Sequence, residues 1–289
     1  MLASRPVQPL AGLLVVDLTR QLPGPYASRE LLRRGARVVK IEPPDGDTTP
    51  PDWYRALNDG KQIVTWDAGT EPPPEVVAEA DVVLEGFRPG VFERLGVPVA
   101  DTTILCSITG FGATGLRAND AGHDLNYLGY AGVLYDTAPA LPPVQVADLA
   151  GGALTAVIEI LAALVERERT GRGARIVVSM MHEAHALAAH RLAGDPLPRL
   201  LTGGAACYRI YETLDGRHLT VAALEPRFWR NLCDQLERPD LIDRAFEPEL
   251  PELAGVFRSR TLAEWRAALE GKDTCVGPVL TLAEAAAEL

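Results

Sequence analysis

The sequence predicts an α/β fold in two domains: a large domain with a Rossmann-like parallel sheet, and a smaller α+β domain. Three observations support this prediction. Short apolar runs alternate with helical stretches as far as residue 180. The segment Asp195-Pro196-Leu197-Pro198 is typical of a linker. The chain of 289 residues is long enough for about two domains. We therefore expect a large domain over residues 1–195 and a small domain over 196–289.

The large domain begins with a continuous apolar run at Leu13–Val16, which is typical of a strand covered on both faces. Gly24-Pro25 open a helix that runs to about Arg34, because proline is favoured at the first helical positions. Ala36–Ile41 is the second expected strand. Further strands are expected at Ile63–Trp66, Val82–Leu84, Thr103–Ile108 and Ala174–Met180.

Helices connect these strands, and proline limits one of them. Residues 68–79 include three consecutive prolines, so this crossover helix is short at best. Helical periodicity predicts helices at Gly151–Arg169 and Met181–Leu192. In the small domain, runs at Cys207–Tyr211 and His218–Ala222 flank Asp215-Gly216, a hairpin pattern. Helices are expected there at Pro226–Gln235 and Leu262–Leu269.

Composition excludes several classes of function. The hydrophobic share of 47% and the formal charge of −11 indicate a globular, acidic protein, whereas nucleic-acid binding needs a basic surface. The apolar helix from Gly151 meets Glu159 and the charged run 166–169, so we expect no membrane span. The N-terminus has no apolar signal region, and the four cysteines form no CxxC pair. These features predict a cytoplasmic protein with reduced thiols.

The most informative residues are His123, in the run GHDLNY, and Asp148, just before Gly151-Gly152. Imidazole and carboxylate can both accept a proton at neutral pH, and two bases at one carbon are what a 1,1-proton transfer requires. A helix start beside them supplies N–H groups for an enolate oxygen. The alternatives are a structural loop histidine and an aspartate that only caps the following helix.

Other motifs argue against cofactors. No GxGxxG follows the first strand, which disfavours a nicotinamide cofactor. The histidines of SMMHEAHALAAH do not have the HExxH spacing of a zinc site, so we expect no metal.

Seven segments, in order, resemble the CaiB/BaiF family of class III CoA-transferases, and within it the α-methylacyl-CoA racemase branch. They are LLVVDLTRQLPGPYAS, VVLEGFRPGVFERLGVP, SITGFGATG, GHDLNYLGYAGVL, ILAALVERERTGRGARIVVSMM, GGAACYRIYETLDGRHLTVAALEPRFW and CVGPVLTLAEA. The resemblance implies a racemase or epimerase acting at C2 of a 2-methylacyl-CoA thioester through an enolate. It also implies an interlocked homodimer and no cofactor beyond the CoA of the substrate.

The resemblance assigns roles to individual residues. His123 and Asp148 exchange protons at C2, and Glu225 orients the histidine. The other expected residues fall into two groups. Arg88, Lys40, Arg37 and the Gly112 loop bind CoA, while Asp124, Asn126, Tyr127, Gly151 and Gly152 surround the thioester.

Two alternatives stay open. In the transferase branch the same aspartate is a nucleophile, so Asp148 could instead be acylated during CoA transfer between a thioester and a carboxylic acid. The second alternative is an inactive, CoA-binding member. The expected basic stretch is replaced by Asp59-Gly60-Lys61-Gln62. The resemblance also implies that a C-terminal segment returning to the large domain is missing here.

Overall fold

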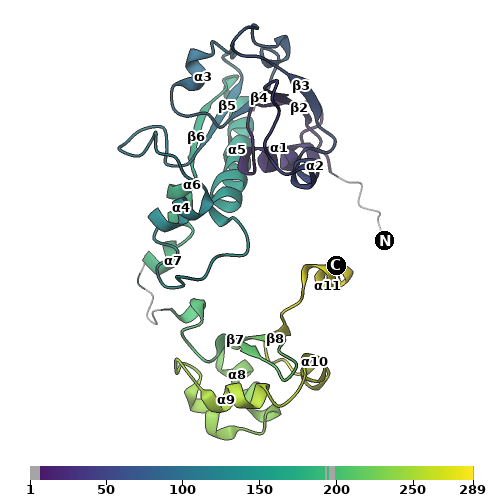
Figure 1. The fold of residues 1–289 in the computed structure, drawn as a ribbon, viewed down its shortest axis with the longest axis vertical. Helices are drawn as coiled ribbons and strands as arrows, with labels where there is room; N and C mark the ends of the chain where they lie inside the picture. Colours follow the sequence, from purple (N-terminus) through teal and green to yellow (C-terminus); the bar gives the residue numbers. More distant parts are fainter. Residues whose placement is uncertain (1–6, 193, 195–198, 289) are drawn as a thin grey trace. The chain divides into compact units, whose positions relative to one another are not determined.

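The computed structural model describes residues 7–192, 194 and 199–288. It divides the chain into two compact units, residues 1–190 and 191–289, and each is described by itself (Figure 1).

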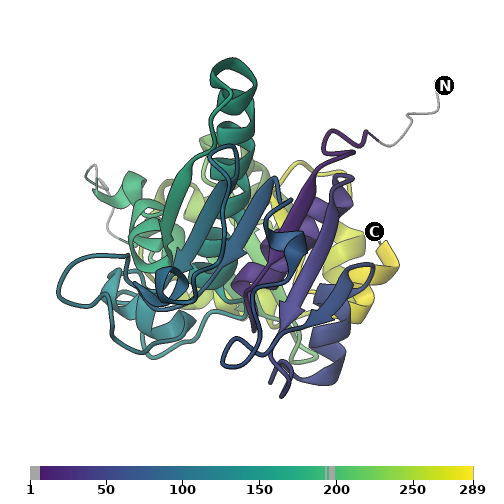
Figure 2. The ribbon, with the colours of Figure 1, turned by 90° about the horizontal axis from the view of Figure 1, so that it is seen from above.

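The first unit contains a six-stranded parallel sheet in the order β3-β2-β1-β4-β5-β6, shown in two views (Figures 1 and 2). From β1, the strands β2 and β3 are added on one side and β4, β5 and β6 on the other. Ligands of such sheets bind in the crevice at the carboxyl ends of the two strands where this change of side occurs, here β1 and β4. The Rossmann-like prediction is confirmed. The strands are β1 Leu14–Asp17, β2 Arg37–Glu42, β3 Gln62–Thr65, β4 Val82–Glu85, β5 Ile104–Thr109 and β6 Arg175–Ser179.

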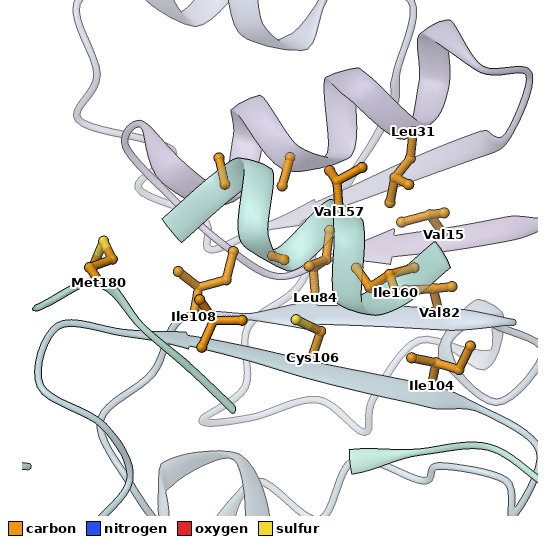
Figure 3. Packing of buried hydrophobic residues seen from close by; sticks show 14 of the residues in the cluster. Val15, Leu31, Val82, Leu84, Ile104, Cys106, Ile108, Val157, Ile160 and Met180 are labelled. Carbon is orange, nitrogen blue, oxygen red and sulfur yellow. The ribbon is translucent and has the colours of Figure 1, made fainter. Parts of the chain in front are cut away.

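Apolar side chains cover both faces of the sheet, as its continuous apolar strands require. On one face, Leu31 of the first helix and Val157 and Ile160 of a long helix pack toward Val15 and Leu84 of the strands (Figure 3). The opposite face has its own cluster, which includes Val16, Val39, Ile41, Trp66, Val83 and Phe92.

Helices and short helical turns connect the strands of this unit. The crossover between β3 and β4 holds only the 3₁₀ turn η1, Glu75–Val77, as the three prolines predicted. The remaining elements are α1 Pro23–Arg33, α2 Pro51–Asn58, α3 Val91–Arg94, α4 Asp124–Tyr130, the π-helical η2 Ala147–Leu154, α5 Thr155–Thr170, α6 Met180–Ala186 and α7 Ala189–Leu192.

Two helix predictions need correction. The long helix begins at Ala147 rather than Gly151, because the π-helical η2 precedes α5 without a break. The predicted helix at 181–192 is interrupted after Ala186. There the Ala188 N–H donates to the His185 carbonyl, three residues back instead of four.

The continuous helix Ala147–Thr170 is, among the described residues, long and apolar enough by length and composition alone to cross a membrane. Core helices of folded domains meet the same criterion. Here 44% of the apolar window is buried within the protein, with Ala156 and Ile160 in the core beneath the sheet.

The second unit contains a three-stranded antiparallel sheet in the order β7-β8-β9. The predicted hairpin is confirmed as β7 Tyr208–Glu212 and β8 His218–Ala222. Trp229, Phe257 and Trp265 fill the core of this unit. Its other elements are η3 Leu200–Thr202, α8 Pro226–Gln235, η4 Pro239–Arg244, α9 Pro251–Phe257, α10 Leu262–Leu269, β9 Val276–Pro278 and α11 Leu282–Glu288.

Candidate active site

Two cavities open beside the carboxyl ends of the parallel strands, and both lie within the first unit. The larger, about 730 Å³, is lined by the loops that follow β1, β4 and β5 and by the residues before α4. The smaller, about 440 Å³, is lined by residues of the β2–α2 loop, α4 and the start of η2. Gln21, Thr48 and His123 line both cavities, so the two spaces meet at the histidine.

His123 immediately precedes α4, and its backbone is held by a reciprocal turn. The His123 N–H donates to the Asn126 side-chain oxygen at 3.1 Å, and the Asn126 N–H donates to the His123 carbonyl at 2.8 Å. The His123 side chain is exposed toward the cavities rather than packed in the core. The imidazole is therefore accessible to a ligand in either cavity.

Asp148 lies in the first turn of η2 and is half-buried. It does not cap the helix as the alternative prediction had it, because the capping position is Val146. Its N–H donates to the Asp124 carboxylate at 3.0 Å. Burial, and next the negative charge of Asp124, raise the pKa of Asp148 to about 7.

The structure therefore brings His123, Asp124 and Asp148 to the wall of one cavity. A carboxyl with a pKa of about 7 exists in both protonation states at neutral pH, and imidazole is a common general acid and base in proteins. Such a pair can both remove and return a proton.

Tyr127 lies beside this site and lines the larger cavity. Its hydroxyl donates to the Gly122 carbonyl, and its ring meets Phe111 edge-on at 5.1 Å. Burial and the charges of Asp148 and Asp124 raise the pKa of Tyr127 to about 12, so the phenol stays protonated. A side chain at Gly110 would overlap this ring, with a Cβ only 2.5 Å from it, which explains the glycine there.

Arg88 lies in the turn after β4 and lines the larger cavity. The buried Glu85 carboxylate holds this turn by accepting the Phe87 N–H at 2.7 Å. Arg20, after β1, lines the same cavity and was missed by the sequence analysis. Arg20 could have been predicted, because it lies in the loop after β1, one of the two strands beside which such sheets bind ligands.

Two of the predicted CoA-binding cations lie elsewhere. Lys40 is fully buried, and its ammonium donates to the Thr19 carbonyl at 2.7 Å and lies 3.5 Å from Asp47. These partners leave it inside the sheet, where it supports the β1 loop. Arg37 is the first residue of β2 and is exposed at the amino edge of the sheet, opposite the cavities.

The predicted glycine roles also change. Gly151 and Gly152 lie inside η2 against α6: a Cβ on Gly151 would be 3.0 Å from the Met180 carbonyl oxygen. They permit close helix packing and line neither cavity. Gly112 lies just beyond the cavity-lining Phe111, and its positive φ of 94° explains the need for glycine.

Glu225 lies in the second unit, directly before α8, with its side chain exposed. Its carbonyl accepts the Phe228 N–H at 3.0 Å and so begins the helix. Its pairing with His123 stays a prediction. Within the described residues, no group of three His, Cys, Asp or Glu side chains is arranged to hold a metal ion.

Comparisons with known proteins agree with the sequence resemblance. The chain is 36% identical to the α-methylacyl-CoA racemase of Mus musculus, over 96% of this chain and 79% of that protein. It is 31% identical to the acetyl-CoA:oxalate CoA-transferase of Acetobacter aceti, over 98% of this chain and 84% of that protein. Among solved structures, a CaiB/BaiF family protein from Brucella suis aligns with a TM-score of 0.81 at 29% identity, covering 97% of this chain and 86% of that one.

The match to CoA-transferase family III spans residues 10–288, nearly the whole chain. The predicted family is confirmed, and acyl-CoA thioesters are the substrates that this family uses. Together with the fold and the cavity geometry, this match identifies the protein as an enzyme of CoA-transferase family III.

Proposed function

We propose that this enzyme is a racemase or epimerase acting at C2 of a 2-methylacyl-CoA thioester. The observation that carries the proposal is the shared cavity of His123 and Asp148, in which the pKa of the carboxyl is raised to about 7. A general base works best when its pKa lies near the operating pH. Among the relatives, the racemase of Mus musculus has the same proposed chemistry in its name.

The reaction needs one proton to leave C2 and one to arrive on the opposite face. One of the pair, Asp148 or His123, takes the C2 proton, and the electron pair moves into the thioester to give an enolate. The other, in its protonated form, then delivers a proton to C2 and restores the thioester. Because the two groups exchange roles with the direction of reaction, the enzyme is ready for both epimers.

The enolate oxygen needs hydrogen-bond donors, and these come from α4 rather than from Gly151 and Gly152. The first N–H groups of a helix have no acceptor within it. Asp124 and Leu125 form the first turn of α4 and line the smaller cavity. Loss of such a donor typically costs about 10²–10³ in rate.

The two cavities suit the two parts of the substrate. Arg20 and Arg88 line the larger one, and arginine binds phosphate groups through paired N–H donors. The smaller one has apolar side chains in its wall, among them Leu22, Trp53 and Leu141, which suit a hydrocarbon chain. His123 at their junction is where the thioester carbon would react.

The test is a proton NMR time course in heavy water with (2S)-2-methylacyl-CoA. We expect loss of the C2 proton and appearance of the R epimer with the wild type. His123→Ala and Asp148→Ala should each slow epimerisation by about 10²–10⁴, the effect of removing one general base. If Asp148→Ala epimerises at the wild-type rate, the two-base assignment is wrong.

CoA transfer is the second candidate, because named CoA-transferases match nearly as well as the racemases do. In that reaction the Asp148 carboxylate attacks the thioester carbonyl and releases CoA thiolate, leaving a mixed anhydride. CoA thiolate then attacks the Asp148 carbonyl of the anhydride, which forms an Asp148–CoA thioester and releases the donor carboxylate. The acceptor carboxylate attacks this thioester and releases CoA thiolate, which attacks the acceptor carbonyl of the new anhydride to give the product thioester and free Asp148. Hydroxylamine or borohydride would trap these species, and a trapped Asp148 adduct without C2 exchange would favour transfer. Neither exchange nor trapping would favour an inactive, CoA-binding member.

A further inference from the structure

Asp124 joins two elements that carry the proposed proton-transfer groups. It is the first residue of α4, directly after His123, and its carboxylate accepts the N–H of Asp148 at the start of η2. The two aspartates are 24 residues apart in sequence. The contact therefore holds the starts of two helices together at the cavity wall.

We propose that Asp124 is a positioning residue that sets both the orientation of Asp148 and the proton affinity of its carboxyl. The hydrogen bond fixes the backbone of Asp148 in the first turn of η2. The negative charge of Asp124, beside a half-buried carboxyl, opposes ionisation of that carboxyl, because like charges repel more strongly where water is excluded.

Other charged groups around η2 do not account for the raised pKa of Asp148. Its two causes are burial and Asp124. Tyr127 also faces both aspartates, since each of them raises its pKa, but it remains neutral. Besides His123, the elements packed against η2 carry these further titratable groups: Tyr26, Arg29, Glu30 and Arg33 on α1, Tyr130 on α4, Glu159, Glu166, Arg167, Glu168 and Arg169 on α5, His182, Glu183 and His185 on α6, Cys106 on β5 and Arg175 on β6.

The two carboxyls therefore have different roles. Asp124 accepts the backbone N–H of Asp148 and helps to raise the pKa of its carboxyl, while Asp148 holds a proton up to about pH 7 and can exchange it with a substrate. This inference rests on the proposed function for its catalytic meaning, whereas the link between the two carboxyls can be measured without turnover.

The first test is a carbon NMR titration of protein labelled at the aspartate carboxyl carbons, with the Asp148 signal assigned from Asp148→Asn. We expect a midpoint of about 7 in the wild type. Asp124→Asn removes the charge but keeps an oxygen acceptor, so the pKa of Asp148 should fall yet stay above 3.8, because burial remains. The control is Asp101→Asn. This exposed carboxyl precedes β5 and so lies at the amino ends of the strands, away from the cavities. Its substitution should leave the midpoint unchanged.

The second readout separates the charge from the hydrogen bond. Amide exchange at the Asp148 N–H should be as slow in Asp124→Asn as in the wild type. In Asp124→Ala it should be about fivefold to tenfold faster, the effect of losing one ordinary hydrogen bond. An unshifted Asp148 midpoint in Asp124→Asn would overturn the proposal, since burial alone would then set the proton affinity.

The effect on catalysis is measured through the pH dependence of C2 exchange. In C2 exchange, the acidic limb of the pH profile should move to lower pH in Asp124→Asn, in step with the NMR midpoint. A shifted midpoint without any C2 exchange in the wild type would leave the Asp124 proposal standing and overturn the racemase proposal. A shifted midpoint with an unmoved kinetic limb would show that Asp124 does not act on catalysis through Asp148.

Discussion

At the scale of single residues, neighbours decide what a buried aspartate does. Burial raises the pKa of Asp17, but the charges of Lys61 and Lys40 and hydrogen bonds from Ser28 and Thr19 outweigh it and hold this pKa low. Asp148 has no cation among its causes and has Asp124 beside it, so its pKa is raised. The first is a structural anion and the second can exchange a proton.

The raised pKa of Asp148 makes stability depend on pH. As pH rises from 4 to 7, the unfolded chain ionises this carboxyl while the folded protein still holds its proton, so rising pH favours unfolding. Asp148→Asn removes this penalty. Its stability advantage over the wild type should grow between pH 4 and pH 8 by up to about 4 kcal/mol, less the effect of partial exposure. Urea unfolding at both pH values measures it, and an equal advantage at both would contradict the raised pKa.

Arg88 is expected to act on binding rather than on chemistry, since it lines the larger cavity and not the smaller one. Arg88→Ala should raise the KM for a CoA thioester by about 10- to 100-fold, the loss of a charged hydrogen bond, with little change in kcat. The KM for the matching pantetheine thioester, which lacks the nucleotide, should not change. Arg94→Ala in α3, an exposed arginine outside both cavities, is the matched control.

At the scale of elements, a buried cluster fixes the start of α1 and the end of α2 relative to the sheet. The Lys61 ammonium donates to the Pro25 carbonyl, the Ser28 hydroxyl and the Asn58 side chain, and lies 3.3 Å from the Asp17 carboxylate. Lys61→Met leaves Asp17 without this cation in the core. It should lower the free energy of unfolding by about 3–5 kcal/mol in urea denaturation.

The exposed pair Arg55–Asp52 on α2 offers the contrast. Arg55→Ala should change stability by less than about 1 kcal/mol, because water already screens this pair. If Lys61→Met lowers the free energy of unfolding as little as Arg55→Ala does, the Asp17–Lys61 cluster does not stabilise this unit.

Sequence patterns predicted the elements whose own residues carry the signal. Continuous apolar runs located the six parallel strands, and the Asp215-Gly216 turn located the hairpin. Strand β9 was missed because three residues that include Gly277 and Pro278 have no strand pattern. The early start of η2 was missed because its glycines pack against α6, a contact that only the folded chain makes.

The candidate site could also be predicted only in part. Local sequence motifs identified His123, Asp148 and Arg88, which the structure places on cavity walls. Lys40 was expected to bind CoA, yet the structure buries it against Thr19 and Asp47, a burial that nothing local in the sequence signals. The proton affinity of Asp148 was equally out of reach, because it depends on Asp124, 24 residues away.

At the scale of the whole molecule, the family resemblance predicts that Glu225 orients His123, although the two residues lie in different units. The family resemblance implies an interlocked homodimer, in which Glu225 of the partner subunit would orient the imidazole. Glu225→Gln should then lower C2 exchange in the wild-type background and have no further effect in His123→Ala, as expected for residues that act together. Glu270→Gln, an exposed glutamate after α10, is the control.

Complementation decides whether the pairing lies within one chain or between two. When His123→Ala and Glu225→Gln chains are co-expressed, each mixed dimer has one intact site only if the glutamate comes from the partner. Random pairing should then recover about a quarter of wild-type exchange from two weakly active variants, provided the dimer is symmetric. Light scattering should give twice the 31.1 kDa chain mass. A dimer without recovered exchange would place both residues of the site in the same chain, and a monomer would exclude the partner altogether.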